Sequence, residues 1–172
     1  MKLRGTNRRQ GLTLLELVIA SSMLAMVMTT VALVLRTARQ AWESHEADFT
    51  RLESLHATVR HIVRQVRQSS AITQISAAND NSGSLAVRLK DGSTIAWDHD
   101  NGLVNCGVTT ADQLLANNIT SLRFVGYKAD GITATTVPTE IHNVFIEATT
   151  TLPNRDVGAT KTITSWVWLR TW

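Results

Sequence analysis

The sequence predicts an α+β protein in which one long N-terminal α-helix, transmembrane over its first half, packs on a small antiparallel β-sheet domain. Three observations predict this fold. An apolar run extends from Leu12 to Leu35, no glycine occurs between residues 12 and 82, and the first proline is Pro138. After Ser70 the chain changes to short β-type runs separated by turn residues, a texture typical of strands. The length of 172 residues fits one globular domain beside an anchor.

The segment 12–35 has the length and composition of a membrane span. Its 24 residues include no Lys, Arg, Asp, Gly or Pro, and Glu16 is the one charged residue. About 20 apolar residues suffice to cross a bilayer as a helix. Hydroxyl side chains are tolerated there because each can bond to a carbonyl one turn earlier; those in the segment are Thr13, Ser21, Ser22, Thr29 and Thr30.

The charges around this segment predict its orientation. Four cationic residues precede it, namely Lys2, Arg4, Arg8 and Arg9. By the positive-inside rule they predict a cytoplasmic N-terminus, although Arg36 and Arg39 on the other side reduce the asymmetry. The apolar segment is longer than that of a cleaved secretory signal and offers only a poor small-x-small site near Ala38. We therefore expect a retained, single-pass anchor.

The net charge gives no support for nucleic-acid binding. The formal charge is +3, but four of the 17 basic residues precede Gly11, which leaves 13 against 14 acidic residues in the remaining chain. A nearly neutral chain lacks the basic surface that such partners require. We predict no nucleic-acid partner.

Glu16 stands out because an ionised carboxylate in hydrocarbon costs several kcal/mol and is a functional-site candidate by default. It lies five residues after Gly11, within Gln-Gly-Leu-Thr-Leu-Leu-Glu-Leu-Val-Ile-Ala at residues 10–20. This stretch resembles the class III leader of prepilins and type II secretion pseudopilins. The resemblance implies a leader peptide at 1–11, cleavage by prepilin peptidase between Gly11 and Leu12, and N-methylation of Leu12. Leu12 departs from the more usual phenylalanine or methionine.

The spacing has a physical rationale. Glycine lets the peptidase approach the backbone closely, and cleavage leaves the apolar helix 12–35 in place with a new ammonium at its first residue. The carboxylate of Glu16 can then pair with the ammonium of a neighbouring subunit, so that each charge offsets the desolvation of the other. Such a pair sets the axial register between subunits in a filament.

The segment 36–69 is predicted to continue the helix as an amphipathic stretch. Its apolar residues recur every three or four positions; they are Phe49, Leu52, Leu55, Val59, Ile62, Val63 and Val66. A helix from Leu12 to about Ser69 would be roughly 85 Å long at 1.5 Å per residue. This arrangement resembles the ladle of the pilin family.

Residues 70–172 are predicted to form a periplasmic β-rich domain. Ser84–Lys90 and Ser93–Trp97 flank Asp91-Gly92 as a hairpin. Further strands are predicted at 103–108, 119–127, 144–151 and 160–170, with one helical turn at 112–117 and an exposed loop from Asp130-Gly131 through Pro138.

The stretch 114–131 resembles the C-terminal half of minor pseudopilins of the J type, in which Leu-Arg-Phe introduces a central strand; here these residues are Leu122, Arg123 and Phe124. The resemblance implies a subunit of the pseudopilus tip complex of a type II secretion system. Its partners would be prepilin peptidase, other minor and major pseudopilins and the inner-membrane assembly platform. The implied location is the bacterial inner membrane. A minor type IV pilin shares the N-terminal features, and a signal-anchored periplasmic sensor or binding domain is the alternative from another class.

We expect no enzyme, because the sequence contains no Gly-x-Ser-x-Gly motif, phosphate loop, Cys-x-x-Cys pair or plausible catalytic triad. The oxygen-rich stretch 98–102 favours a polar hairpin turn over a calcium site near Asp98 and Asp100, since it lacks a complete calcium-loop pattern. We expect no other cofactor or metal. His45, His56 and His61 favour solvated or interfacial positions over metal ligation.

Two further features concern the predicted β domain. Cys106 is the one cysteine, so it forms no intramolecular disulfide and is expected to be a small strand or turn residue. Trp166, Trp168 and Trp172 share one strand parity near the end of the chain. Because a strand apolar on both faces is usually buried on both, packing in the core is favoured over docking of a neighbouring subunit.

Overall fold

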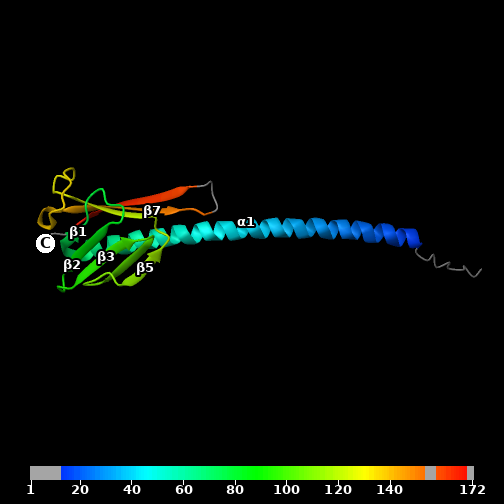
Figure 1. Cartoon of the computed structure of the whole chain (residues 1–172), viewed down its shortest axis with the longest axis horizontal. Coiled ribbons are helices and arrows are strands. Elements are labelled where there is room, and N and C mark those ends of the chain that lie inside the picture. Colours follow the sequence, from blue (N-terminus) through cyan, green and yellow to red (C-terminus); the bar gives the residue numbers. More distant parts are fainter. Residues whose placement is uncertain (1–12, 154–157, 170–172) are drawn as a thin grey trace, which may run out of the picture. The chain divides into compact units, whose positions relative to one another are not determined.

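The computed structural model of the chain describes residues 13–153 and 158–169. One helix, α1 at Leu14–Gln68, precedes eight strands in this part of the chain (Figure 1). The strands are β1 Ser69–Ile75, β2 Ser84–Leu89, β3 Thr94–Asp100, β4 Leu103–Val108, β5 Gln113–Asn117, β6 Ser121–Tyr127, β7 Asn143–Thr151 and β8 Thr160–Trp168, with a 3₁₀ turn, η1, at Pro138–Glu140. The predicted α+β class is confirmed.

Helix α1 belongs to two compact units, because the contacts divide the chain between Glu43 and Ser44. The first unit contains the apolar part of the helix. The second contains the remainder of α1 and all eight described strands. The predicted helix is therefore confirmed from Leu14 to Gln68, without a break at the boundary between the units.

Every strand pairing in the described residues is antiparallel, in two sheets. One sheet has the order β1-β2-β3-β4-β5 and the other the order β6-β7-β8. The β2–β3 hairpin turns at Gly92, whose φ of 89° is in the left-handed region that glycine adopts at little cost. The next hairpin turns at Asn101 and Gly102, both with positive φ, as expected of a two-residue β-hairpin turn.

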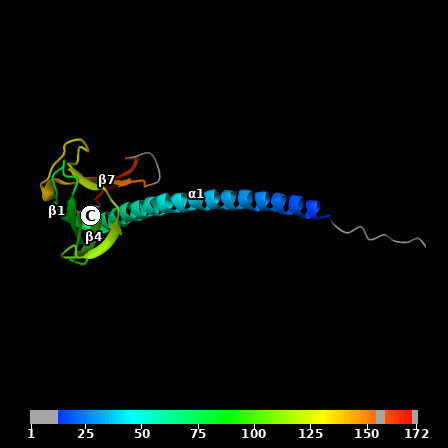
Figure 2. The same ribbon diagram turned by 45° about the vertical axis from the view of Figure 1, so that its right-hand side comes forward.

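The core lies where the second part of α1 meets both sheets. Figures 1 and 2 show β7 above this part of the helix and strands β4 and β5 below it. Four buried helix residues, spaced by three and four, contribute to one apolar cluster with both sheets; they are Leu55, Val59, Ile62 and Val66. The predicted stripe is thus confirmed at its centre. Phe49 is a correction, because 66% of its surface is exposed.

The strands differ from the predictions in two places. Residues 113–117 form β5 and not a helical turn: leucine, alanine and glutamine favour helix locally, but pairing with β4 along Leu103–Cys106 imposes the extended state. Strand β1 was not predicted individually, because Ser69 follows α1 directly with no intervening turn residue. The Ser69 hydroxyl donates to the carbonyl of Val66, 2.7 Å away, and closes the helix end.

Candidate functional site

Glu16 lies in the first turn of α1 and forms a capping box with Thr13. Its Oε2 accepts hydrogen bonds from the Thr13 backbone N–H at 2.9 Å and from the Thr13 hydroxyl at 3.0 Å. The Glu16 N–H in turn donates to Thr13 Oγ1 at 3.3 Å. This reciprocal Thr-x-x-Glu arrangement satisfies backbone donors that would otherwise be free at a helix start. The carboxylate is therefore held at the very beginning of the apolar helix.

Thr13 is the hydrogen-bond partner of Glu16, which the sequence analysis missed. We expected its hydroxyl to bond to a carbonyl one turn earlier, but at the first turn it bonds to Glu16 instead. The Thr-x-x-Glu spacing was the available signal. Gly11 and Leu12, the predicted cleavage site, lie outside the described residues.

The apolar side chains of α1 before Glu43 are uncovered on all sides. Leucine, valine, isoleucine and methionine residues are exposed around the entire circumference of the helix, and none of the most apolar 18-residue window is buried. Among the described residues α1 is the one helix long and apolar enough to cross a membrane. Exposed apolar surface of this extent indicates burial against something outside the chain, which is compatible with a single-pass anchor.

The hydroxyl groups of this segment are satisfied within the helix, as predicted. Ser21 and Ser22 donate to the carbonyls of Val18 and Ile19. Thr29 and Thr30 donate to carbonyls four residues earlier, at 2.7 and 2.9 Å. These bonds hide the polar groups, which lowers the cost of placing them in an apolar environment.

The tryptophans of β8 are a correction. Trp166 is 47% exposed and Trp168 59% exposed, so neither packs in the core; Val167, of the opposite parity, is buried instead. The centroid of the Trp166 ring lies 5.0 Å from the ring centroids of Tyr127 and Phe145. These rings form an aromatic cluster on the outer face of the β6-β7-β8 sheet. Trp172 lies outside the described residues.

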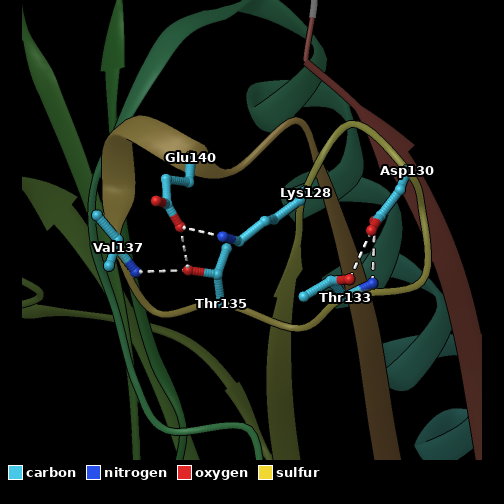
Figure 3. Close-up of polar contacts among 6 residues, drawn as sticks. All are labelled: Lys128, Asp130, Thr133, Thr135, Val137 and Glu140. Atoms are coloured by element: carbon cyan, nitrogen blue, oxygen red, sulfur yellow. Dashed lines mark hydrogen bonds and ion pairs between the residues drawn. The ribbon is translucent and has the colours of Figure 1, made fainter.

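The predicted exposed loop after β6 is ordered by a polar network (Figure 3). Lys128 Nζ lies 2.9 Å from Glu140 Oε2, which also accepts from the Thr135 hydroxyl at 3.1 Å. These interactions lower the pKa of Glu140. At the tip, the hydroxyl and amide of Thr133 donate to Asp130 and lower the pKa of that carboxyl to about 2. The segment also contains η1, whose N-terminal residue is Pro138.

The remaining candidates lie apart from one another. Asp98 and Asp100 lie on the exposed face of β3, while His99 between them is buried, with Nε2 2.8 Å from the carbonyl oxygen of Ile119. Within the described residues no group of three or more His, Cys, Asp or Glu side chains is arranged to hold a metal ion. Cys106 is half-buried in β4, where burial and then the charge of Asp112 raise the pKa of its thiol.

The three helical histidines lie on α1. His45 and His56 are exposed, as expected of solvated residues. His61 is half-buried, with its ring edge-on to that of Trp97 at 6.1 Å. Burial, and then the charge of Arg64, lower the pKa of His61.

Comparison with known proteins names no family for the chain: neither a protein-family model nor a curated protein matches it. The functional argument therefore depends on the residues and the geometry described above.

Proposed function

We propose that the protein is a pilin-like structural subunit of the bacterial inner membrane, with its N-terminus cytoplasmic and its β domain periplasmic. Prepilin peptidase would cleave after Gly11 and methylate the amine of Leu12. The mature chain would join other minor and major pseudopilins at the assembly platform of a type II secretion system, as a J-type subunit of the tip complex. The proposal assigns it an assembly role and no catalytic reaction.

One observation carries the proposal: the carboxylate of Glu16 lies at the start of a helix whose apolar side chains before Glu43 are left uncovered by the described part of the chain. A cut after Gly11 would place the new ammonium only one residue before Thr13, the capping partner of Glu16. The charge pair between neighbours would then form at the start of every helix. This geometry supports register-setting between parallel apolar helices.

The capping box supplies a competing role for Glu16, and one substitution separates the two roles. Glutamine also serves at this position of a capping box, so Glu16→Gln keeps the bonds to Thr13 but removes the charge. If Glu16 pairs with a neighbour's ammonium, Glu16→Gln will insert in the membrane normally and fail to co-purify with other subunits. Normal co-purification of this variant would leave Glu16 with the capping role alone.

The cleavage itself is tested by the mass of the N-terminal peptide of the membrane form. We expect a chain that begins at N-methylated Leu12 in the wild type and the uncleaved chain in Gly11→Val. A wild-type chain beginning at Met1 would instead support the signal-anchored sensor or binding domain. A Gly5→Val variant is the matched control, because Gly5 lies within the same leader away from the cut, and it should mature normally.

A further inference from the structure

The two sheets have four edges, and three of them are protected against pairing with another strand. Strand β1 has register shifts between Ser69 and Ala71 and between Ile72 and Gln74, and η1 contacts it. Strand β5 has only five residues and pairs with β4 through a shifted register. Bulges and short strands are two ways in which proteins prevent edge pairing.

Strand β6 is protected by segments of the chain that lie along its outer edge. The first of these segments is residues 81–83. The carbonyl oxygen of Leu122 accepts from the Gly83 N–H at 2.8 Å, and the Leu122 N–H donates to the carbonyl oxygen of Asn81 at 2.9 Å. Further along, the N–H of Thr135 donates to the carbonyl of Gly126 at 2.8 Å. Both ends of this edge are therefore occupied.

Strand β8 differs from the other three. Its nine residues pair with β7 in one unbroken register, without a bulge. It contains no proline, and its one charged residue is Lys161. A long, regular and nearly uncharged edge is the form that most readily accepts another strand.

The hydrogen-bond pattern identifies which groups of β8 face this edge. Leu169 donates to His142 and Leu152 donates to Ala159 at the two ends of the β7–β8 pair. Because consecutive residues of a strand direct their backbone groups to opposite sides, the odd-numbered residues bond to β7. The even-numbered residues direct N–H and C=O to the free edge; they are Thr160, Thr162, Thr164, Trp166 and Trp168, all exposed. In the described part of the chain no backbone group pairs with them.

We propose that the free edge of β8 receives an extended strand from a neighbouring, non-identical subunit, which adds a fourth strand to the β6-β7-β8 sheet. This inference deepens the proposed function and depends on it. A self-paired β8 is disfavoured by the proposed function. Antiparallel pairing of two copies would reverse residues 44–68 of one helix relative to the other, since β8 lies alongside this part of α1 (Figures 1 and 2). The proposed function instead requires the helices of neighbouring subunits to run in parallel.

The side chains along the edge define the chemistry of the incoming strand. Next to Trp166 and Trp168 it should present apolar residues, which would continue the aromatic cluster with Tyr127 and Phe145 and bury the exposed indole rings. Near Lys161 it should present an acidic residue or none with positive charge. Backbone pairing would supply the affinity and these alternate side chains the selectivity.

Proline substitutions at the free edge test the proposal in full-length chains in native membranes. Thr164→Pro removes an N–H that faces the edge and spares the bonds to β7, whereas Thr164→Val keeps the N–H. A photoreactive benzophenone side chain at position 162 reports the contact. We expect it to cross-link to an extended segment of another pilin-like subunit, with a yield at least about tenfold lower in Thr164→Pro than in Thr164→Val.

Hydrogen exchange on the wild-type chain gives a second measurement that requires no variant. In the co-purified assembly the amides of Thr162, Thr164 and Trp166 should exchange more slowly than in the isolated chain, whereas those of Ile163 and Ser165 should be protected in both. A cross-link to a second copy of this chain, an unchanged yield in Thr164→Pro, or no gain in protection would each overturn the proposal.

The proposed function fails by a different outcome, namely a wild-type chain that is not cleaved after Gly11 or does not co-purify with other subunits. If the wild type matures and co-purifies while the edge remains unprotected, only the pairing of β8 is refuted.

Discussion

Residues 14–43 and residues 44–68 of α1 share one continuous helical backbone, but they differ in what surrounds their apolar side chains. In the first part Leu24 is 58% exposed, and other leucine and methionine side chains are exposed on every face of the helix. In the second part Ile62 is fully buried and belongs to a stripe that faces both sheets. Helical conformation alone therefore does not determine the environment. The first part has apolar residues all round, whereas the second has them on one face.

The difference shows how one helix can serve two purposes. The second part is stabilised by the β domain, since burial of its stripe contributes to a shared core. The first part contributes no described packing to that core, and its apolar surface is available to lipid or to other helices. The substitutions below are designed to test whether the two parts are independent.

The largest difference should appear when buried and exposed apolar residues are truncated. Ile62→Ala leaves a cavity in the core and should lower the free energy of unfolding by about 2–5 kcal/mol. Leu24→Ala, with its side chain outside the core, should leave the stability of the β domain unchanged. Urea unfolding of the full-length chain in detergent micelles, followed by near-ultraviolet circular dichroism, measures both. Equal losses would contradict the separation of the two parts.

A charge in the first part of α1 should lower membrane insertion without changing the stability of the β domain. Leu24→Arg places a guanidinium near the middle of the apolar segment and should disfavour membrane insertion by about 2.5–3.5 kcal/mol, while the β domain keeps its unfolding midpoint. Carbonate extraction of membranes, with quantification of the retained chain, measures this effect. His56→Arg, on the exposed face of the second part, is the control and should be retained as the wild type is.

The sequence allowed the helix to be predicted almost to its last residue, because a 3.6-residue periodicity and the absence of glycine and proline are local signals. It also identified Glu16, whose charge contrasts with its neighbours. The sequence did not allow features that depend on contacts between distant residues to be predicted. Strand β5 is extended because β4 pairs with it, and no local propensity reveals a partner strand.

The tryptophans of β8 illustrate a second limit. Alternation places Trp166 and Val167 on opposite faces of a strand, but it does not say which face the rest of the chain covers. Apolar residues on both faces of the strand favoured Trp166 for the core, whereas the structure exposes Trp166 and buries Val167. The side facing the core is decided by the order β6-β7-β8 and by the position of α1, both of which are properties of the whole fold.

A smaller effect is expected at the contact between α1 and β7. The Arg51 guanidinium donates to the carbonyl oxygen of Thr151 at 2.9 Å, across 100 residues of sequence. Because Arg51 is half-exposed, Arg51→Met should cost about 1 kcal/mol, which is below the roughly 1.5–3 kcal/mol of a hydrogen bond to a charged group. Arg60→Met removes an exposed guanidinium from the same helix and should change the urea midpoint little. Similar losses in both variants would show that the bond to Thr151 does not matter.

The smallest effect is a local pH dependence in the loop of Figure 3, which lies outside both parts of α1. Hydrogen bonds from Thr133 lower the pKa of Asp130 from 3.8 to about 2. Because the folded-state pKa lies below the unfolded value, the contribution of these bonds is present above pH 3.8 and is lost as the pH falls through about 2. The amide chemical shifts of Ile132 and Thr133 in micelles should titrate accordingly.

Removal of one donor should shift this titration. Thr133→Val deletes the hydroxyl that bonds to Asp130 while keeping the backbone N–H, so the pKa of Asp130 should rise part of the way towards 3.8. Thr136→Val, in the same loop, is the matched control and should leave the midpoint unchanged. If both variants titrate like the wild type, the Thr133 hydroxyl does not hold the carboxylate, and the backbone N–H groups of Ile132 and Thr133 account for the lowered pKa of Asp130.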